Sequence, residues 1–180
     1  MENINDEFCF KRFGKIDVSN FKKIIHEANL DWDKFDFRQK RGNTHKETKC
    51  IPIIFDESFS MSKFTLTENY PFFKDEILKL ESYLKEKIQE EGFIFRAILV
   101  NLPKKKSIPP HKDSGESLEV PRRIHIPIIT NEDCYFTVGE VTKNMKEGEI
   151  WEINNDKKMH SVSNDGDADR IHLIVDFLKK

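Results

Sequence analysis

Two stretches in the first half of the chain carry apolar residues at helical spacing. The first follows Asp17 or Ser19, either of which can cap a helix, and runs to about Asn29, while the second covers residues 72–90. Their apolar positions are Phe21, Ile24, Ile25 and Ala28, and then Phe73, Ile77, Leu80, Leu84 and Ile88. Gly92 is placed to end the second helix in a left-handed cap. Because each helix has one apolar stripe, we expect both to pack on the outside of something larger.

From residue 93 onward the pattern changes to short β-branched or aromatic runs bounded by Gly, Pro, Asn or Asp. The predicted strands are 93–101, 123–130, 135–138, 149–154 and 170–177, preceded by a strand at 49–55 and an edge strand within residues 1–16. Strands without intervening helices indicate a sandwich or barrel, with the two helices buttressing one sheet. We expect one domain over residues 1–180, helical or irregular in 1–92 and a β core in 93–177.

The segment from residue 30 to residue 48 is polar with aromatic interruptions and shows no regular period. Long irregular segments in compact domains are often functional lids. Trp32 is interpreted as a packing anchor. His45 has no partner near it in the sequence and receives little functional weight.

Two of the predicted strands share an R-x-H form, R-I-H-I-P-I-I-T and R-I-H-L-I-V-D-F. Alternation places Arg123 and His125 on one face of the first and Arg170 and His172 on one face of the second, with apolar residues opposite. This favours a polar cavity inside a barrel over exposure to solvent. An arginine buried in such a cavity needs an anionic partner, and a bidentate carboxylate would serve.

His111, Asp113 and His160 are the candidate metal ligands. His111 and Asp113 share one face of an extended strand, and two prolines stiffen the approach to them. Taken alone, such an H-x-D pair is better interpreted as a surface hydrogen bond. Together with His160 it forms the two-histidine, one-carboxylate facial triad of non-haem Fe(II) oxygenases, and Arg170, ten residues further on, suits a cosubstrate that ends in a carboxylate.

Composition bears on the partners and the cellular compartment of the protein. Charged residues make up 34% of the chain and the formal net charge is −2, so we expect no nucleic-acid partner. We also expect no membrane association, because no apolar run reaches spanning length, and the amino terminus lacks the features of a signal peptide. Three scattered cysteines favour a reducing compartment, so a cytoplasmic protein is the expectation.

The Asp-Gly-Asp-Ala-Asp run that follows His160 lacks the sixth-position glycine and the twelfth-position glutamate of a calcium loop. It predicts a hairpin turn.

Several motifs in order resemble the aspartyl/asparaginyl β-hydroxylase family of 2-oxoglutarate-dependent oxygenases, which includes bacterial free-proline hydroxylases. They are N-L-P-K-K-K-S-I-P-P-H-K-D, R-R-I-H-I-P-I-I-T-N, G-E-I-W-E-I-N-N and H-S-V-S-N-D-G-D-A-D-R-I-H-L-I-V-D, all within residues 93–177. The family's glycine after the proline of the first motif is Lys104 here, which we interpret as loop variation.

The resemblance implies a mainly β double-stranded β-helix (a jelly-roll, cupin-like fold) with flanking helices. It implies Fe(II) held by His111, Asp113 and His160, with 2-oxoglutarate and O2 as cosubstrates. It places Arg170 on the distal carboxylate of 2-oxoglutarate, and Arg123 and His125 near the cosubstrate or substrate carboxylates. Since Asp113 is kept, hydroxylation is favoured over halogenation.

Two functions follow as hypotheses. The first is an Fe(II)/2-oxoglutarate dioxygenase that hydroxylates an amino acid, either free and proline-like or an Asp/Asn-type residue in a peptide, with release of succinate and CO2. Arg96 and Arg122 are weak candidates for binding a substrate carboxylate, although alternation puts Arg122 on the face opposite Arg123, and surface arginines are an equal alternative. The second function is a non-catalytic cupin-like module that binds a metal or a small acid.

Overall fold

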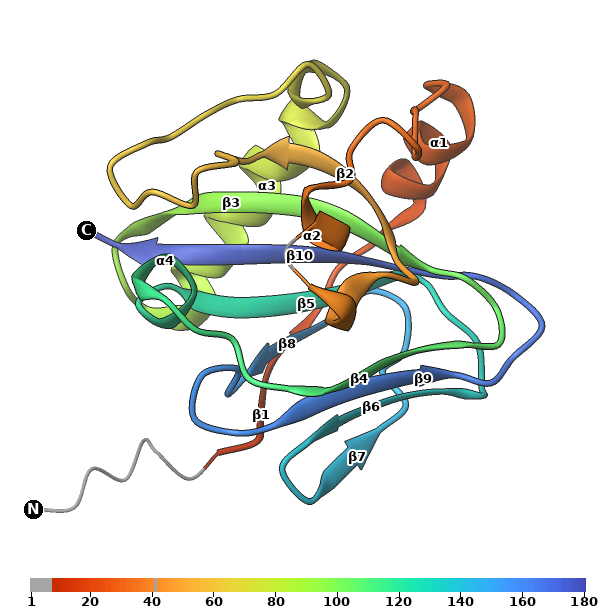
Figure 1. The fold of residues 1–180 in the computed structure, drawn as a ribbon. Coiled ribbons are helices and arrows are strands. Elements are labelled where there is room, and N and C mark those ends of the chain that lie inside the picture. The colour runs from red at the N-terminus through yellow and green to blue at the C-terminus, as the bar shows by residue number, and fades with distance from the viewer. Residues whose placement is uncertain (1–7, 41) are drawn as a thin grey trace, which may run out of the picture.

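The chain folds into two antiparallel β-sheets with helices on one side, as a computed structural model shows for residues 8–40 and 42–180 (Figure 1). The larger sheet has the strand order β1 (Phe10–Lys15), β8 (Glu149–Ile153), β5 (Arg122–Ile129), β10 (Arg170–Lys179), β3 (Gly92–Leu102) and β2 (Lys49–Ile54). The smaller sheet has the order β4 (Lys106–His111), β9 (His160–Asn164), β6 (Cys134–Val138) and β7 (Val141–Lys143). Residues 1–7, part of the expected edge strand and of the amino terminus judged to lack a signal peptide, lie outside the described residues.

The two predicted helices pack on the outer face of the larger sheet. They are α1 (Ser19–Glu27) and α3 (Tyr70–Ile88); in Figure 1, α3 passes behind the large sheet, and both helices lie away from the small sheet. Phe21 of α1 and Phe73 of α3 stack on each other and join the isoleucines of β5 in one buried core. Trp32 packs against the same core, so its interpretation as an anchor is confirmed. The single apolar stripe of each helix is thereby buried.

The inner face of the large sheet meets the small sheet. Leu102 and Ile153 from the large sheet form a second apolar cluster with Ile108, Phe136 and Val162 from the small one. The mainly β jelly-roll expectation is confirmed. Alternation along β5 and β10 is confirmed as well, because Ile124 is fully buried in the helical core while Arg123 and His125 face inward.

Short elements from the irregular segments cover the inner side. They are α2 (Phe37–Lys40), drawn beside β3 and β10 in Figure 1, the 3-10 helix η2 (Asn43–His45), and α4 (Glu116–Glu119) between β4 and β5. Among the described residues, no helix is both long and apolar enough to cross a membrane.

The prediction for Gly92 is wrong. Gln89 takes the left-handed position after α3, with φ of 59°, and Gly92 begins β3 beside the end of β10. A Cβ at Gly92 would stand 2.5 Å from the carbonyl oxygen of Leu178 and 2.6 Å from the ring of Phe177. Glycine is therefore required by the close approach of two strands, and the helix ends without it.

Substituting Gly92→Ala should lower the free energy of unfolding by about 1–3 kcal/mol, because the added methyl group forces β3 and β10 apart. Glu91→Ala, an exposed neighbour, is the control and should change it by less than about 0.5 kcal/mol. Denaturant titration of both variants measures the difference. Equal stability of the two variants would contradict this reason for the glycine.

Candidate active site

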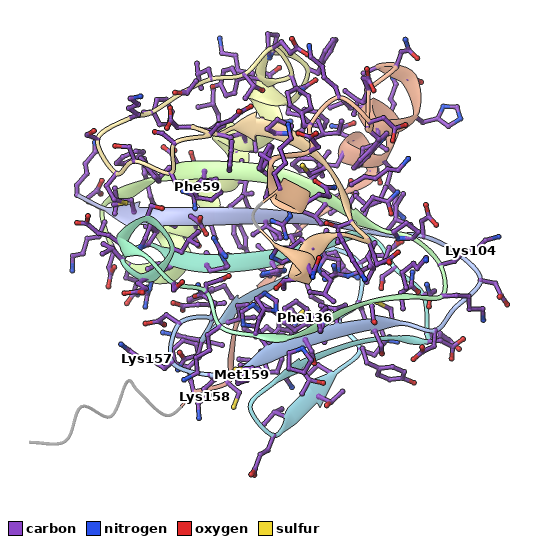
Figure 2. All side chains as sticks on the ribbon, viewed as in Figure 1. Phe59, Lys104, Phe136, Lys157, Lys158 and Met159 are labelled. Carbon is purple, nitrogen blue, oxygen red and sulfur yellow. The ribbon has the colours of Figure 1, made fainter. Side chains whose placement is uncertain are left out.

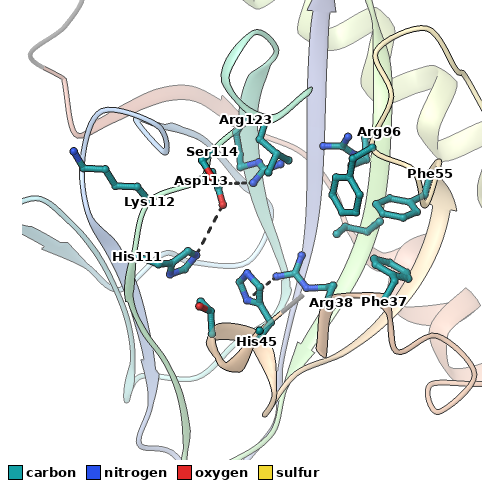
Figure 3. A pocket seen from close by; sticks show the side chains of 15 residues that line it. Phe37, Arg38, His45, Phe55, Arg96, His111, Lys112, Asp113, Ser114 and Arg123 are labelled. Atoms are coloured by element: carbon teal, nitrogen blue, oxygen red, sulfur yellow. Dashed lines mark hydrogen bonds and ion pairs between the residues drawn. The ribbon is translucent and has the colours of Figure 1, made fainter. Parts of the chain in front are cut away.

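A cavity of about 210 Å³ opens on the inner side of the large sheet, at the carboxyl end of β4 (Figure 3). Its lining comes from four parts of the chain that are distant in sequence: the α2–η2 segment, the region after β2, β3, and the segment from β4 to β5. Gly42 turns the chain between α2 and η2 with φ of 133°, a conformation that favours glycine. The cavity thus joins the β core to the irregular amino-terminal segment.

The three predicted metal ligands meet at one edge of this cavity. His111 is the last residue of β4 and pairs with His160, the first residue of β9, while Asp113 lies two residues beyond the strand. Asp113 Oδ1 is 4.0 Å from His111 Nε2, and Asp113 Oδ2 is 3.9 Å from His160 Nε2. One donor atom from each residue lies within 4.8 Å of the others. Because bonds of about 2.1 Å let one ion bridge donors up to about 4.2 Å apart, small movements would complete a metal site.

The protonation states also suit metal binding. His111 Nδ1 donates to the carbonyl oxygen of Pro109 at 2.9 Å, which leaves the Nε2 lone pair free. Burial lowers the pKa of His160 to about 4, so its ring is neutral at pH 7. Burial alone would raise the pKa of Asp113, but the guanidinium of Arg123 outweighs it and holds that pKa well below its ordinary value. The neutral imidazole of His160, the carboxylate of Asp113 and the Nε2 atom of His111 are therefore available as ligands.

Asp113 is held from two sides. Asn155, in the turn between β8 and β9, donates its side-chain amide to Asp113 Oδ2 at 3.0 Å, and its carbonyl accepts the Asp113 backbone N–H at 3.0 Å. On the other side, Arg123 Nη1 donates to Asp113 Oδ2. Sequence reasoning missed Asn155, since a single asparagine in a turn carries no distinguishing signal.

Arg123 belongs to a buried network of charges rather than standing free for a cosubstrate. Its Nε and Nη2 donate to the two oxygens of Asp176, each at 2.9 Å. Arg96 approaches the same carboxylate, with Nη1 2.5 Å from Asp176 Oδ2. Burial would lower the pKa of Arg123, but Asp113 and Asp176 raise it above its ordinary value. Arg123 thus positions Asp113, and its predicted contact with 2-oxoglutarate gains no support.

Arg96 lines the cavity and is 3% exposed, so interpreting it as a surface arginine is wrong. Arg122 lies elsewhere, where it forms ion pairs with Glu152 at 3.2 Å and with Glu90 at 3.8 Å. The structure does not bring Arg122 to the metal ligands, in agreement with the strand alternation.

Arg170 lies deeper between the sheets and is 1% exposed. Its Nη2 donates to His172 Nδ1 at 2.6 Å, while Nε has no hydrogen-bond partner, and no carboxylate pairs with it among the described residues. Burial lowers the pKa of Arg170 to about 10, so it stays charged at pH 7. Burial, and then Arg170, lower the pKa values of His125 and His172 well below the ordinary value.

Phe136, labelled between the sheets in Figure 2, connects this inner group to the metal ligands. Its ring is 5.7 Å from the guanidinium of Arg170, 4.9 Å from the ring of His125 and 6.2 Å from the ring of His160. The Nδ1 atoms of His125 and His160 have no hydrogen-bond partner. A buried cation with an unsatisfied Nε and no carboxylate partner among the described residues is consistent with a site for a small anion.

Arg38 and His45 are cavity residues that sequence reasoning did not select. Arg38 Nη2 donates to His45 Nδ1 at 3.0 Å, and the His45 ring lies 5.0 Å from that of His111 (Figure 3). His45 therefore has a partner and lines the cavity, which its position in the sequence did not indicate. The only signal was the position of both residues in a long irregular segment.

Lys104 lies at the far tip of the turn between β3 and β4, a position where loop sequences can vary (Figure 2).

Comparison with solved structures shows how widely this fold is shared. A 2OG-Fe(II) oxygenase family oxidoreductase from Burkholderia pseudomallei is 15% identical with a TM-score of 0.67, over 91% of this chain and 78% of that one. HygX from Streptomyces hygroscopicus, solved with nickel and 2-oxoglutarate, is 11% identical with a TM-score of 0.62, over 98% and 85%. The viral collagen prolyl hydroxylase of Paramecium Bursaria Chlorella virus-1, a 2OG complex, is 8% identical with a TM-score of 0.61, over 99% of each chain.

At these identities the likeness establishes the jelly-roll fold. No curated protein matches by sequence. The family model described as Aspartyl/Asparaginyl beta-hydroxylase, however, matches residues 2–180. That match extends the resemblance from the motifs of the β core to the helical and irregular first half, and the chain therefore belongs to the aspartyl/asparaginyl β-hydroxylase family.

Proposed function

We propose that the protein is an Fe(II)- and 2-oxoglutarate-dependent dioxygenase that hydroxylates an amino acid and releases succinate and CO2. Family membership supports the reaction class. The observation that carries the proposal to this chain is Arg170, a buried cation without a carboxylate partner among the described residues, beside three converging metal ligands. A buried charge without a counter-charge is costly, so its presence supports an anion from outside the chain.

The donor set fits Fe(II). Two histidines and one carboxylate on one side of an ion leave coordination positions open for other ligands. Bound iron with 2-oxoglutarate would supply the oxidising power that a protein side chain lacks. His111, Asp113 and His160 would hold the ion, and Asn155 and Arg123 would keep the carboxylate of Asp113 in place.

Arg170 would bind the distal carboxylate of 2-oxoglutarate. His172 restrains one side of its guanidinium, and Nε is free for an acceptor. Apolar contacts around Phe136 would exclude water from this inner part of the site. A metal-binding module without activity would have no use for this arginine, and no observation favours that alternative.

The reaction itself is tested by measuring succinate formed from 2-oxoglutarate in the presence of Fe(II), O2 and each candidate amino acid. We expect release that depends on iron, because the three ligands form the site. His160→Ala should reduce succinate release by at least about 100-fold, since one of the three metal ligands is lost. His26→Ala, which changes an exposed histidine on α1, is the control and should retain full activity. Equal activity of both variants would exclude the proposed metal site.

Arg170→Ala should weaken 2-oxoglutarate binding by about 10- to 100-fold, because a charge-assisted, bidentate interaction is lost. Iron binding should stay unchanged, since Arg170 contacts none of the metal ligands. Calorimetric titration of each ligand into the variant and into Arg12→Ala, an exposed control, measures both affinities. If iron affinity falls while 2-oxoglutarate affinity holds, the role assigned to Arg170 is wrong.

A further inference from the structure

Arg38 stands across the cavity from the metal ligands, on α2 (Figure 3). Its Nη2 donates to His45 Nδ1, so that nitrogen carries no proton. The hydrogen bond restrains one end of the guanidinium. Arg38 Nε is buried without a hydrogen-bond partner, and among the described residues no carboxylate forms an ion pair with this arginine. Burial lowers the pKa of Arg38 to about 10, which leaves the side chain charged at pH 7.

The charges around the cavity leave Arg38 unmatched. Arg96 and Arg123 are balanced by the carboxylates of Asp113 and Asp176, which they contact. Lys112 points away from the other labelled side chains in Figure 3. In the proposed function, Fe(II) and Arg170 together carry three positive charges, and the two negative charges of 2-oxoglutarate face them. The loaded site would therefore keep a positive charge at Arg38 that favours an anionic substrate.

The other wall of the cavity is aromatic. Phe37 and Phe55 stack with ring centroids 4.2 Å apart, and Phe59 meets Phe55 edge to face at 5.1 Å. Ile98 completes this apolar surface. A ligand that fills the cavity meets a guanidinium and an apolar wall at once, which suits a small molecule with one carboxylate and a compact apolar part.

We propose that Arg38 binds the α-carboxylate of a free amino acid, whose side chain packs against Phe37, Phe55 and Phe59 and is thereby held toward the metal ligands. This inference rests on the proposed function and names its substrate class. The volume of about 210 Å³ is below the range of roughly 300–1,000 Å³ typical of pockets for larger ligands. An internal residue of a peptide has its α-carboxylate in an amide bond and offers Arg38 no such anion.

The test compares acids with amides on the intact protein loaded with Ni(II) and 2-oxoglutarate. The probes are the twenty protein amino acids, the carboxamide of each, and N-acetyl amides of aspartate and asparagine as peptide mimics. Calorimetry measures binding to the wild type, Arg38→Gln, Arg38→Lys and the exposed control Arg12→Gln. Succinate release with Fe(II) gives KM and kcat for the same probes.

We expect at least one free amino acid to bind about 10- to 100-fold more tightly than its amide. Arg38→Gln should remove this preference by weakening the acid alone, with KM raised and kcat and 2-oxoglutarate affinity little changed. Arg38→Lys should restore part of the preference, because lysine keeps the positive charge but lacks the paired N–H donors of the guanidinium. Arg12→Gln should match the wild type.

Equal binding of acid and amide by the wild type would overturn the inference, and this comparison stands even if a variant fails to fold. Binding of the N-acetyl amides but of none of the free amino acids would overturn it as well. Either result, accompanied by normal 2-oxoglutarate and iron binding, would leave the proposed function intact. Loss of 2-oxoglutarate binding in the wild type would instead remove the proposed function, and this inference with it.

Discussion

The carboxylate of Asp176 accepts hydrogen bonds from two arginines while almost fully buried, and the site is built around this contact. Arg123 extends the network to Asp113, so a chain of alternating charges runs from the middle of β10 and β3 to the loop after β4. Removing one member would leave an uncompensated buried charge, which costs several kcal/mol. The network therefore ties a loop residue to the stiff centre of the large sheet, and Asp113 gains a fixed position that a loop alone does not provide.

The rest of the fold follows from keeping the inner face of the large sheet polar at one end. The apolar side chains of β5 and β10 face the helices α1 and α3, which cover the opposite side of the sheet. Inward-facing positions are thus available for arginine and histidine without loss of the main core. The small sheet supplies His111, His160 and Phe136, and it closes over Arg170. Arg170 is buried and Arg38 has a buried Nε, and neither forms an ion pair with a carboxylate among the described residues, so we assign a different anion to each.

Strand periodicity was enough to predict a sandwich or barrel and the inward arginines and histidines, and the family resemblance added the jelly-roll topology. Alternation with period 2 fixes the face of each residue, so the amino-acid sequence alone could place Arg123, His125 and Arg170 in one interior. Their partners could not be predicted. Alternation puts Asp176 on the same strand face as Arg170 and His172, but its pairing with Arg96 and Arg123 depends on the register of three strands. For that reason the prediction placed Arg123 near the carboxylates of the cosubstrate or the substrate and did not include its contact with Asp113.

The substrate side of the cavity was the least predictable part. Arg38 and His45 lie in two very short helices with no hydrophobic period, and tertiary contacts such as the packing of Phe37 against Phe55 bring them to the cavity. The prediction for Gly92 was wrong for a related reason. Glycine is needed there because β10, which is distant in the sequence, comes too close for a Cβ atom. Contacts between distant segments set these roles, and local patterns do not record them.

The central claim is that His111, Asp113 and His160 bind an iron to which 2-oxoglutarate also binds. The most direct measurement is the visible absorption spectrum of the protein with Fe(II) and 2-oxoglutarate in the absence of oxygen. A metal-to-ligand charge-transfer band that appears only when both are present, and that vanishes on substitution of Asp113→Ala, is the predicted result. A wild-type protein that gives no such band at saturating Fe(II) and 2-oxoglutarate would contradict the account.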